Sequence, residues 1–258
     1  AQGVCVFLDY DGTLTPIVND PDKAYMSREM RSAVLEVSRA FPTAIISGRS
    51  LEKVRGFVQL DNLYYAGSHG LDIDGPKQGG VHGKPEGKGF VSYQAAADYI
   101  HLVVDVRDIL IERTRHIEGV KVEDNKYCCS VHFRNCKEES LAEVESVVQK
   151  VVAESEGLDL KKGRKVFEIR PKITWNKGHA VSYLLDAWGL SGSPSCFPIY
   201  LGDDRTDEDA FVKLRELYGH SGCFPILVST RAKETCATHS LSDPSEVLQF
   251  LNKLAQWA

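Results

Sequence analysis

The chain has 258 residues, 43% hydrophobic and 26% charged, which is typical of a globular protein with one large domain or two small ones. Lys and Arg total 31 against 36 for Asp and Glu, and the net charge of −5 argues against a nucleic-acid binder with a uniformly basic surface. No apolar run reaches about 18 residues, so no membrane span is expected. Seven cysteines without C-x-x-C spacing indicate neither a zinc site nor a disulfide framework, and they favour a reducing compartment.

The first 75 residues predict alternating strands and helices. Short apolar runs at 4–8, 43–46 and 63–66 are typical of strands buried on both faces. Between these strands we expect one helix capped by Ser27 and a second helix at 51–58. The order strand, helix, strand, helix, strand predicts a parallel sheet with right-handed crossovers.

The middle of the chain has a different pattern. Residues 75–89 contain six glycines and two prolines and predict a loop or a boundary. The elements expected after it are a helix at 93–113, a hairpin around 124–126, a helix at 138–154 and a hairpin around 161–164. This order describes an α+β module, so we expect a cap domain at 76–170 inserted into a core formed by 1–75 and 171–258.

The parallel-sheet pattern returns after the insertion. Strands are expected at 197–201 and 225–228, and helices at 177–187, 208–218 and 244–257. The fold expected for the whole chain is therefore α/β, with a Rossmann-like core built on a parallel sheet and an inserted α+β cap domain.

The first predicted strand ends in Asp9-Tyr10-Asp11-Gly12-Thr13, at the edge where parallel sheets bind ligands. Carboxylates at positions i and i+2 of an extended segment face the same side, so Asp9 and Asp11 can share one divalent cation and one reacting group. A solvated turn or a calcium-type loop is the alternative interpretation.

Three other strand ends also carry polar residues. Ser47 and Gly48 can hold phosphate oxygens, or Ser47 can cap the helix that follows. Lys177 can neutralise the charge of a phosphoryl group, or it can be solvated at the start of its helix. Residues 203–209 contain five acids in seven positions, and this density indicates a bound cation because the carboxylates otherwise repel one another.

In their order and context, these four segments resemble the four motifs of the haloacid dehalogenase superfamily. The resemblance implies that Asp9 attacks phosphorus to give an aspartyl-phosphate, and that Asp11 serves as general acid and base. It also implies that Ser47 and Lys177 fix the phosphate. The implied cofactor is Mg²⁺, held by Asp9, the main-chain carbonyl of Asp11 and Asp203, with Asp204 and Asp207 as candidates for supporting the metal and its waters.

Longer stretches at 8–17, 67–70, 168–171 and 202–209 resemble the trehalose-6-phosphate phosphatase family, and its plant members most of all. The resemblance covers nearly the whole chain and implies a phosphatase that releases trehalose and phosphate from trehalose 6-phosphate. Three alternatives stay open. They are a phosphatase of another sugar phosphate such as sucrose 6-phosphate or mannosylglycerate phosphate, a phosphomutase, and a non-catalytic sugar-phosphate sensor.

The predicted cap hairpins carry charged side chains that suit the many hydroxyls of a disaccharide. The candidates are Lys121, Glu123, Lys126, His132, Arg134, Arg164 and Glu168, and an ordinary charged sheet surface is the alternative for each. The family resemblance favours Glu123, Lys126, Arg134 and Glu168 as sugar-binding residues. In the core, His69 either lines the mouth of the site or makes a structural hydrogen bond. Arg49, beside Gly48, either reaches the phosphate or pairs with a carboxylate.

Cys128 and Cys129 are neighbours in a predicted strand, so their side chains should point to opposite faces. We expect at most one of them to be buried, and ordinary packing is favoured over thiol-based regulation.

The expected partner is a small-molecule sugar phosphate, bound by a monomer that uses neither nucleic acid nor a membrane. The chain opens directly on an apolar strand, so we expect a truncated N-terminus. A cytoplasmic location is the default expectation, and organellar targeting stays open.

Overall fold

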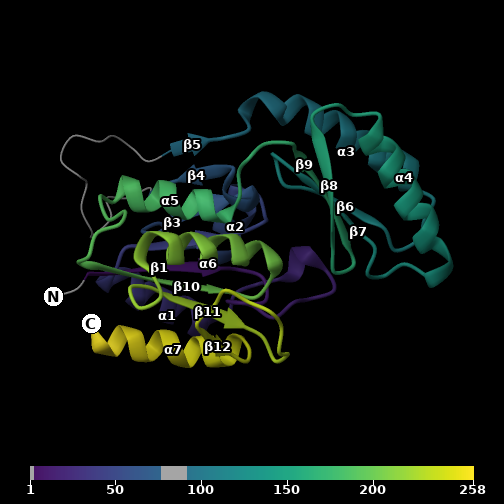
Figure 1. The fold of residues 1–258 in the computed structure, drawn as a ribbon. Coiled ribbons are helices and arrows are strands. Elements are labelled where there is room, and N and C mark those ends of the chain that lie inside the picture. The colour runs from purple at the N-terminus through teal and green to yellow at the C-terminus, as the bar shows by residue number, and fades with distance from the viewer. Residues whose placement is uncertain (1–2, 77–91) are drawn as a thin grey trace. The chain divides into compact units, whose positions relative to one another are not determined.

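The computed structural model describes residues 3–76 and 92–258, and the chain divides into two compact units (Figure 1). Unit 1 comprises Ala1–Tyr93 with Trp175–Ala258, and unit 2 comprises Gln94–Thr174. The insert was predicted at 76–170, and most of the loop predicted at 75–89 lies outside the described residues. A capping role for unit 2 stays a prediction.

The core is an eight-stranded sheet in the order β12-β11-β10-β1-β2-β3-β4-β5. The strands are β1 (Gly3–Asp9), β2 (Thr43–Ile46), β3 (Tyr64–Gly67), β4 (Asp72–Asp74), β5 (Ser92–Gln94), β10 (Cys196–Gly202), β11 (Phe224–Val228) and β12 (His239–Leu241). Pairing is parallel from β12 through to β3, whereas β4 runs antiparallel to β3. The predicted α/β core with a parallel sheet is confirmed.

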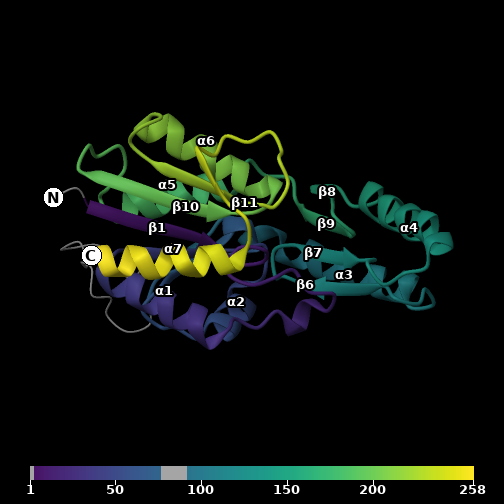
Figure 2. The same cartoon turned by 90° about the horizontal axis from the view of Figure 1, so that it is seen from below.

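Helices cover both faces of this sheet (Figures 1 and 2). One face carries α1 (Arg28–Ala40), α2 (Leu51–Val58) and α7 (Pro244–Trp257), and the other carries α5 (Lys177–Ala187) and α6 (Arg205–Tyr218). In β1, Val6 and Leu8 pack with the first group of helices, while Cys5 and Phe7 pack with the second. A strand buried on both faces explains the continuous apolar run in its sequence.

Helix starts in unit 1 follow their capping residues. Ser27 accepts a hydrogen bond from the backbone N–H of Met30 and begins α1, as predicted. Helix α6 begins earlier than the predicted residue 208, because Asp204 caps it and forms a reciprocal capping box with Asp207. Two short 3₁₀ turns, Pro21–Lys23 and Ser68–Gly70, complete the described elements of unit 1.

Unit 2 is a four-stranded antiparallel sheet in the order β6-β7-β9-β8, with two helices packed on one face. Its elements are η3 (Ala97–Tyr99), α3 (Ile100–Thr114), β6 (Lys121–Asp124), β7 (Cys129–His132), η4 (Glu138–Ser140), α4 (Leu141–Ala153), β8 (Leu158–Gly163) and β9 (Val166–Pro171). Both predicted hairpins are confirmed. Their helix-facing residues, such as Val131 and Ile169, form one core with Val106 and Val148.

The helix predicted at 93–113 begins too early. Ser92–Gln94 forms strand β5, and the helix starts only at Ile100 after a 3₁₀ turn. The ring of Tyr93 lies 5.0 Å from that of Trp175 and 4.9 Å from that of Tyr183. All three rings belong to unit 1, so Tyr93 packs within this unit and is not part of the helix.

The expectation for the adjacent cysteines is wrong, because Cys128 and Cys129 are both buried. Cys129 packs under the helices, while Cys128 lies on the opposite face, near Glu123, Glu168 and Arg170. Burial raises the pKa of both thiols, which disfavours the reactive thiolate. All seven cysteines are free thiols.

Among the described helices, none combines the length and the apolar character needed to cross a membrane.

Candidate active site

The carboxyl ends of three adjacent core strands bring the predicted polar segments together. Strand β1 lies between β10 and β2, with Leu8 opposite Leu201 and Asp9 opposite Ile46. The residues that follow, Asp11 after β1, Ser47 after β2 and Asp203 after β10, therefore leave the sheet at one edge.

Lys177 joins two of the acids at this edge. Its Nζ donates to Asp9 Oδ1 at 2.6 Å and to Asp207 Oδ1 at 2.7 Å. The lysine is only 2% exposed, so the alternative of a solvated lysine is excluded. Asn176 fixes the start of its helix by accepting the backbone N–H of His179.

Asp207 is held by more than the lysine. The hydroxyl of Tyr200 also donates to Asp207 Oδ1 at 2.7 Å, and the backbone N–H of Asp204 donates to Asp207 Oδ2 at 3.0 Å. Tyr200 was missed from the sequence because an aromatic residue inside an apolar strand is usually core. Its position three residues before Asp203, where the acidic run begins, is the signal in the sequence that could have pointed to it.

The electrostatics show an excess of negative charge around one ammonium group. Burial and the charge of Asp207 raise the pKa of Asp9. Burial and the same charge raise the pKa of Asp203 to about 8, and burial raises that of Asp207 to about 6. Burial opposes the charge on Lys177, yet the two acids it contacts raise its pKa overall. The cluster is therefore short of positive charge.

The same cluster fits a divalent cation. Carboxylate oxygens of Asp9, Asp203 and Asp207 all lie within 4.8 Å of one another, and hard oxygen ligands are those that Mg²⁺ prefers. Gly12 lets Asp203 approach, because a Cβ at this position, where φ is +86°, would lie 2.2 Å from Asp203 Oδ2. Asp204 lies beside the cluster, where its Oδ1 accepts the backbone N–H groups of the first turn of α6.

Asp11 has a different environment from Asp9. Arg49 donates from Nε to Asp11 Oδ2 and from Nη2 to Asp11 Oδ1, both at 2.7 Å. The Asp11 side chain is 38% exposed, whereas that of Arg49 is 8% exposed. Of the two interpretations of Arg49, the structure shows the pairing with a carboxylate.

The loops after β2 and β3 are joined by backbone hydrogen bonds. The N–H of His69 donates to the carbonyl of Ser47 at 2.9 Å, and that of Ser68 donates to the carbonyl of Arg49 at 2.7 Å. Ser68 and His69 both have positive φ, which is uncommon for non-glycine residues and often marks a functional segment. The His69 ring lies against Gly48, where a Cβ would approach Cε1 to 2.8 Å.

Ser47 does not cap helix α2. The N-cap is Ser50, whose side chain accepts the backbone N–H of Lys53. The Ser47 hydroxyl instead accepts the backbone N–H of Arg49 at 3.1 Å, inside the loop. This placement keeps Ser47 available as a phosphate-binding residue.

The four sugar-binding candidates all belong to unit 2. Glu123 and Glu168 both lie opposite Ser130, in one row across the sheet face away from the helices. His132 Nε2 lies 2.8 Å from Glu123 Oε2. Lys126, in the β6–β7 turn, and Arg134, beyond β7, lie at opposite ends of the hairpin. The structure therefore brings the two glutamates together but not the two cations.

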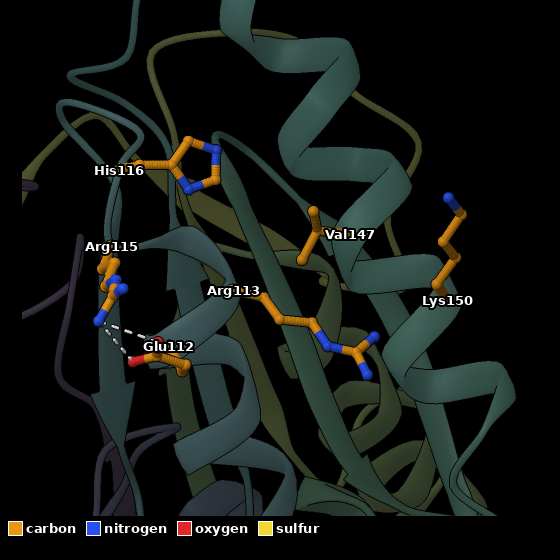
Figure 3. A pocket seen from close by; sticks show the side chains of 6 residues that line it. All are labelled: Glu112, Arg113, Arg115, His116, Val147 and Lys150. Atoms are coloured by element: carbon orange, nitrogen blue, oxygen red, sulfur yellow. Dashed lines mark hydrogen bonds and ion pairs between the residues drawn. The ribbon is translucent and has the colours of Figure 1, made fainter.

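A hollow between α3 and α4 of unit 2 offers no comparable chemistry (Figure 3). It has a volume of about 580 Å³ and is lined by Glu112, Arg113, Arg115, His116, Val147 and Lys150. Its charges are largely paired, since Arg113 contacts Glu154 and Arg115 contacts Glu112. The strand-end cluster of unit 1 is the better candidate for a reaction site.

Solved structures share this fold. A haloacid dehalogenase-like hydrolase from Bacteroides thetaiotaomicron matches 98% of this chain and 100% of its own with a TM-score of 0.62 at 14% identity, which shows the fold alone. The C-terminal domain of trehalose-6-phosphate phosphatase from C. albicans matches with a TM-score of 0.77 at 27% identity, covering 99% of this chain and 92% of that one.

Sequence comparisons show the family to which the chain belongs. The pattern of the family described as trehalose-phosphatase matches residues 7–246. The probable trehalose-phosphate phosphatase J of Arabidopsis thaliana is 49% identical over 254 residues, which is 98% of this chain and 68% of that protein. Trehalose 6-phosphate phosphatase RA3 of Zea mays is 52% identical, over 98% of this chain and 70% of its own. The chain belongs to the trehalose-phosphatase family, and it is an enzyme of the phosphoric monoester hydrolase class.

Proposed function

We propose that this chain hydrolyses trehalose 6-phosphate to trehalose and phosphate, with Asp9 as the nucleophile and Mg²⁺ as the cofactor. One observation carries the proposal. Asp9 is a buried carboxylate at the end of the central strand β1, and Lys177 holds one of its oxygens inside an acidic cluster. The plant relatives that match 98% of the chain are described as trehalose-phosphate phosphatases, which supports the choice of sugar.

In the first half of the reaction, Asp9 Oδ2 forms a bond to phosphorus while the bond from phosphorus to the sugar oxygen breaks. Lys177 orients the attack by holding the other oxygen, Oδ1. Asp11 gives its proton to the departing sugar oxygen, so that trehalose leaves as an alcohol. In the second half, Asp11 takes a proton from water, whose oxygen bonds to phosphorus as the bond to Asp9 breaks and phosphate is released.

The acidic cluster would hold the metal, and the phosphate-binding groups would come from the neighbouring loops. The proposed ligands are Asp9, Asp203 and the main-chain carbonyl of Asp11, with Asp204 and Asp207 as supporting residues. When bound, Mg²⁺ neutralises charge on the phosphoryl oxygens. Ser47, the N–H of Gly48 and the ammonium of Lys177 would hold the same oxygens in place.

We assign Glu123, Lys126, Arg134 and Glu168 of unit 2 to the sugar hydroxyls, and His69 to the mouth of the site. In this proposal residues 76–170 act as a cap domain, and the chain works as a monomer on a small sugar phosphate. Size-exclusion chromatography with light scattering tests the monomer, for which a mass near 28.6 kDa is expected.

The test is phosphate release from trehalose 6-phosphate, sucrose 6-phosphate, glucose 6-phosphate and mannose 6-phosphate, each with Mg²⁺ and with EDTA. Asp9→Asn should abolish release, whereas Asp105→Asn, an exposed position on α3, should leave it unchanged. Preference for another sugar phosphate would overturn the substrate assignment, and activity in EDTA would overturn the assignment of Mg²⁺ as the cofactor. No turnover of any substrate would favour a sensor, and an isomeric sugar phosphate as product would show a mutase.

A further inference from the structure

Each aspartate of the Asp9-Tyr10-Asp11 segment is paired with a cation from a different loop. Asp9 is buried and contacts Lys177 at the start of α5. Asp11 is partly exposed and contacts Arg49 after β2, with each carboxylate oxygen accepting one N–H at 2.7 Å. The planar guanidinium matches a carboxylate in two parallel hydrogen bonds, which fixes its orientation as well as its position.

Arg49 is itself held firmly. Its guanidinium carbon lies 5.1 Å from the centre of the Phe57 ring, and that ring stacks at 5.9 Å on Tyr10. On the main chain, its N–H donates to the Ser47 hydroxyl and its carbonyl accepts the N–H of Ser68. An arginine fixed at both its backbone and its head group can impose its orientation on a more exposed partner.

We propose that Arg49 is a positioning residue for the reaction, acting through Asp11. By donating one N–H to each carboxylate oxygen, Arg49 holds Asp11 in the orientation from which a proton, carried on the second lone pair of one of these oxygens, reaches the sugar oxygen. This inference rests on the proposed function, because it needs Asp11 to be the general acid. It departs from the assignment of Arg49 to phosphate binding, since two of its three guanidinium nitrogens, Nε and Nη2, bind Asp11.

The two roles of Arg49 predict different dependence on the leaving group. A sugar alkoxide is a poor leaving group and needs a proton, whereas p-nitrophenolate leaves without one. Loss of a group that positions the acid therefore slows transfer from a sugar phosphate but hardly affects p-nitrophenyl phosphate. Loss of a phosphate-binding group slows both substrates alike. The quantity to compare is kcat/KM, which reports transfer to Asp9 and excludes the later hydrolysis step.

The experiment measures kcat/KM for trehalose 6-phosphate and p-nitrophenyl phosphate with the wild type, Arg49→Gln, Arg49→Lys, Asp11→Asn and the double variant Arg49→Gln/Asp11→Asn. General acid catalysis contributes about 10²- to 10⁴-fold, so Arg49→Gln should lose about 10²-fold on the sugar phosphate and less than about threefold on the aryl phosphate. Arg49→Lys keeps the charge and should recover part of the loss. In the Asp11→Asn background, Arg49→Gln should add nothing, because its partner is already removed.

Arg55→Gln is the matched control. Arg55 is also a poorly exposed arginine that pairs with a carboxylate, Asp74, and lies over an aromatic ring, Tyr65. Its replacement should affect both substrates by the same factor, whatever it does to stability.

Two results would overturn the proposal: equal losses on both substrates with Arg49→Gln, or a full further loss in the Asp11→Asn background. If the wild type does not hydrolyse p-nitrophenyl phosphate, the double-variant comparison on the sugar phosphate decides alone. If trehalose 6-phosphate is not hydrolysed but another sugar phosphate is, the substrate assignment fails while the same comparison on that sugar still tests Arg49. Denaturant unfolding of each variant separates misfolding from lost positioning.

Discussion

Asp203→Asn should make the metal-free protein more stable while it removes activity. The wild-type carboxylate lies in a cluster with Asp9 and Asp207, and burial with the neighbouring negative charge raises its pKa to about 8. An amide has nearly the same shape but carries no charge. The substitution therefore relieves repulsion in the folded state and removes a proposed metal ligand at the same time.

The size of the gain depends on pH. The carboxyl of Asp203 has an ordinary pKa of 3.8, so the unfolded chain releases this proton near pH 4, while the folded chain keeps it up to about pH 8. Because the folded-state pKa is raised, stability falls by up to about 1.4 kcal/mol for each pH unit between these limits. The three units from pH 4 to pH 7 give at most about 4 kcal/mol. Partial solvent exposure of the side chain reduces this to roughly 1–3 kcal/mol.

The assay is urea unfolding in EDTA, near pH 4 and near pH 7, of the wild type, Asp203→Asn and the exposed control Asp105→Asn. Asp203→Asn should match the wild type near pH 4 and exceed it near pH 7, and Asp105→Asn should match it at both. Added Mg²⁺ should stabilise the wild type near pH 7 but not Asp203→Asn. A gain that does not change with pH, or a loss of stability near pH 7, would refute the reasoning.

Three further substitutions test the packing of the site by denaturant unfolding and phosphate release. Lys177→Met leaves two acids without their buried cation and should cost about 3–5 kcal/mol and all measurable activity, whereas Lys213→Met at a partly exposed ion pair should stay within about 1 kcal/mol. Gly12→Ala should destabilise by about 1–2 kcal/mol or more because of its positive φ and its contact with the acidic cluster, while Gly56→Ala, which has open space in helix α2, should stabilise by up to about 1 kcal/mol. Tyr200→Phe removes a buried donor and should cost about 1–3 kcal/mol.

The parallel core could be predicted because each of its central strands is buried on both faces, which gives a continuous apolar run. Helices α2, α5 and α7 were predicted with the bounds that the structure shows. The short strands β4 and β12 were not predicted. Each has only three residues and carries polar side chains, so its conformation depends on pairing with the preceding strand and leaves no apolar run in the sequence.

Less of the candidate site than of the fold could be predicted, because tertiary contacts decide which side chains pair with one another. The order of the motifs pointed to Asp9, Ser47, Lys177 and Asp203, and the structure places all four at one sheet edge. The sequence left two interpretations of Arg49 open, since a bidentate contact with a residue 38 positions away leaves no local pattern. The burial of both Cys128 and Cys129 was mispredicted for a similar reason. Alternation along a strand tells which face a side chain takes, but not whether that face is covered.

Asp9 and Asp11 have different surroundings, and such differences can suit two carboxyl groups to different catalytic roles. In our proposal Asp9 is the nucleophile, which must be ionised and fixed. Asp9 is buried beside Lys177, and burial and the charge of Asp207 raise its pKa. The Lys177 ammonium only partly offsets this rise in the pKa of Asp9, and the proposed Mg²⁺ would favour the charged carboxylate further. The proposed general acid and base must instead exchange protons with substrate and water. Asp11 is the more exposed of the two aspartates, and in our proposal Arg49 sets the orientation of its carboxyl group. The structure gives positions i and i+2 of one strand end different cationic partners, and the proposed separate roles of Asp9 and Asp11 rest on this difference.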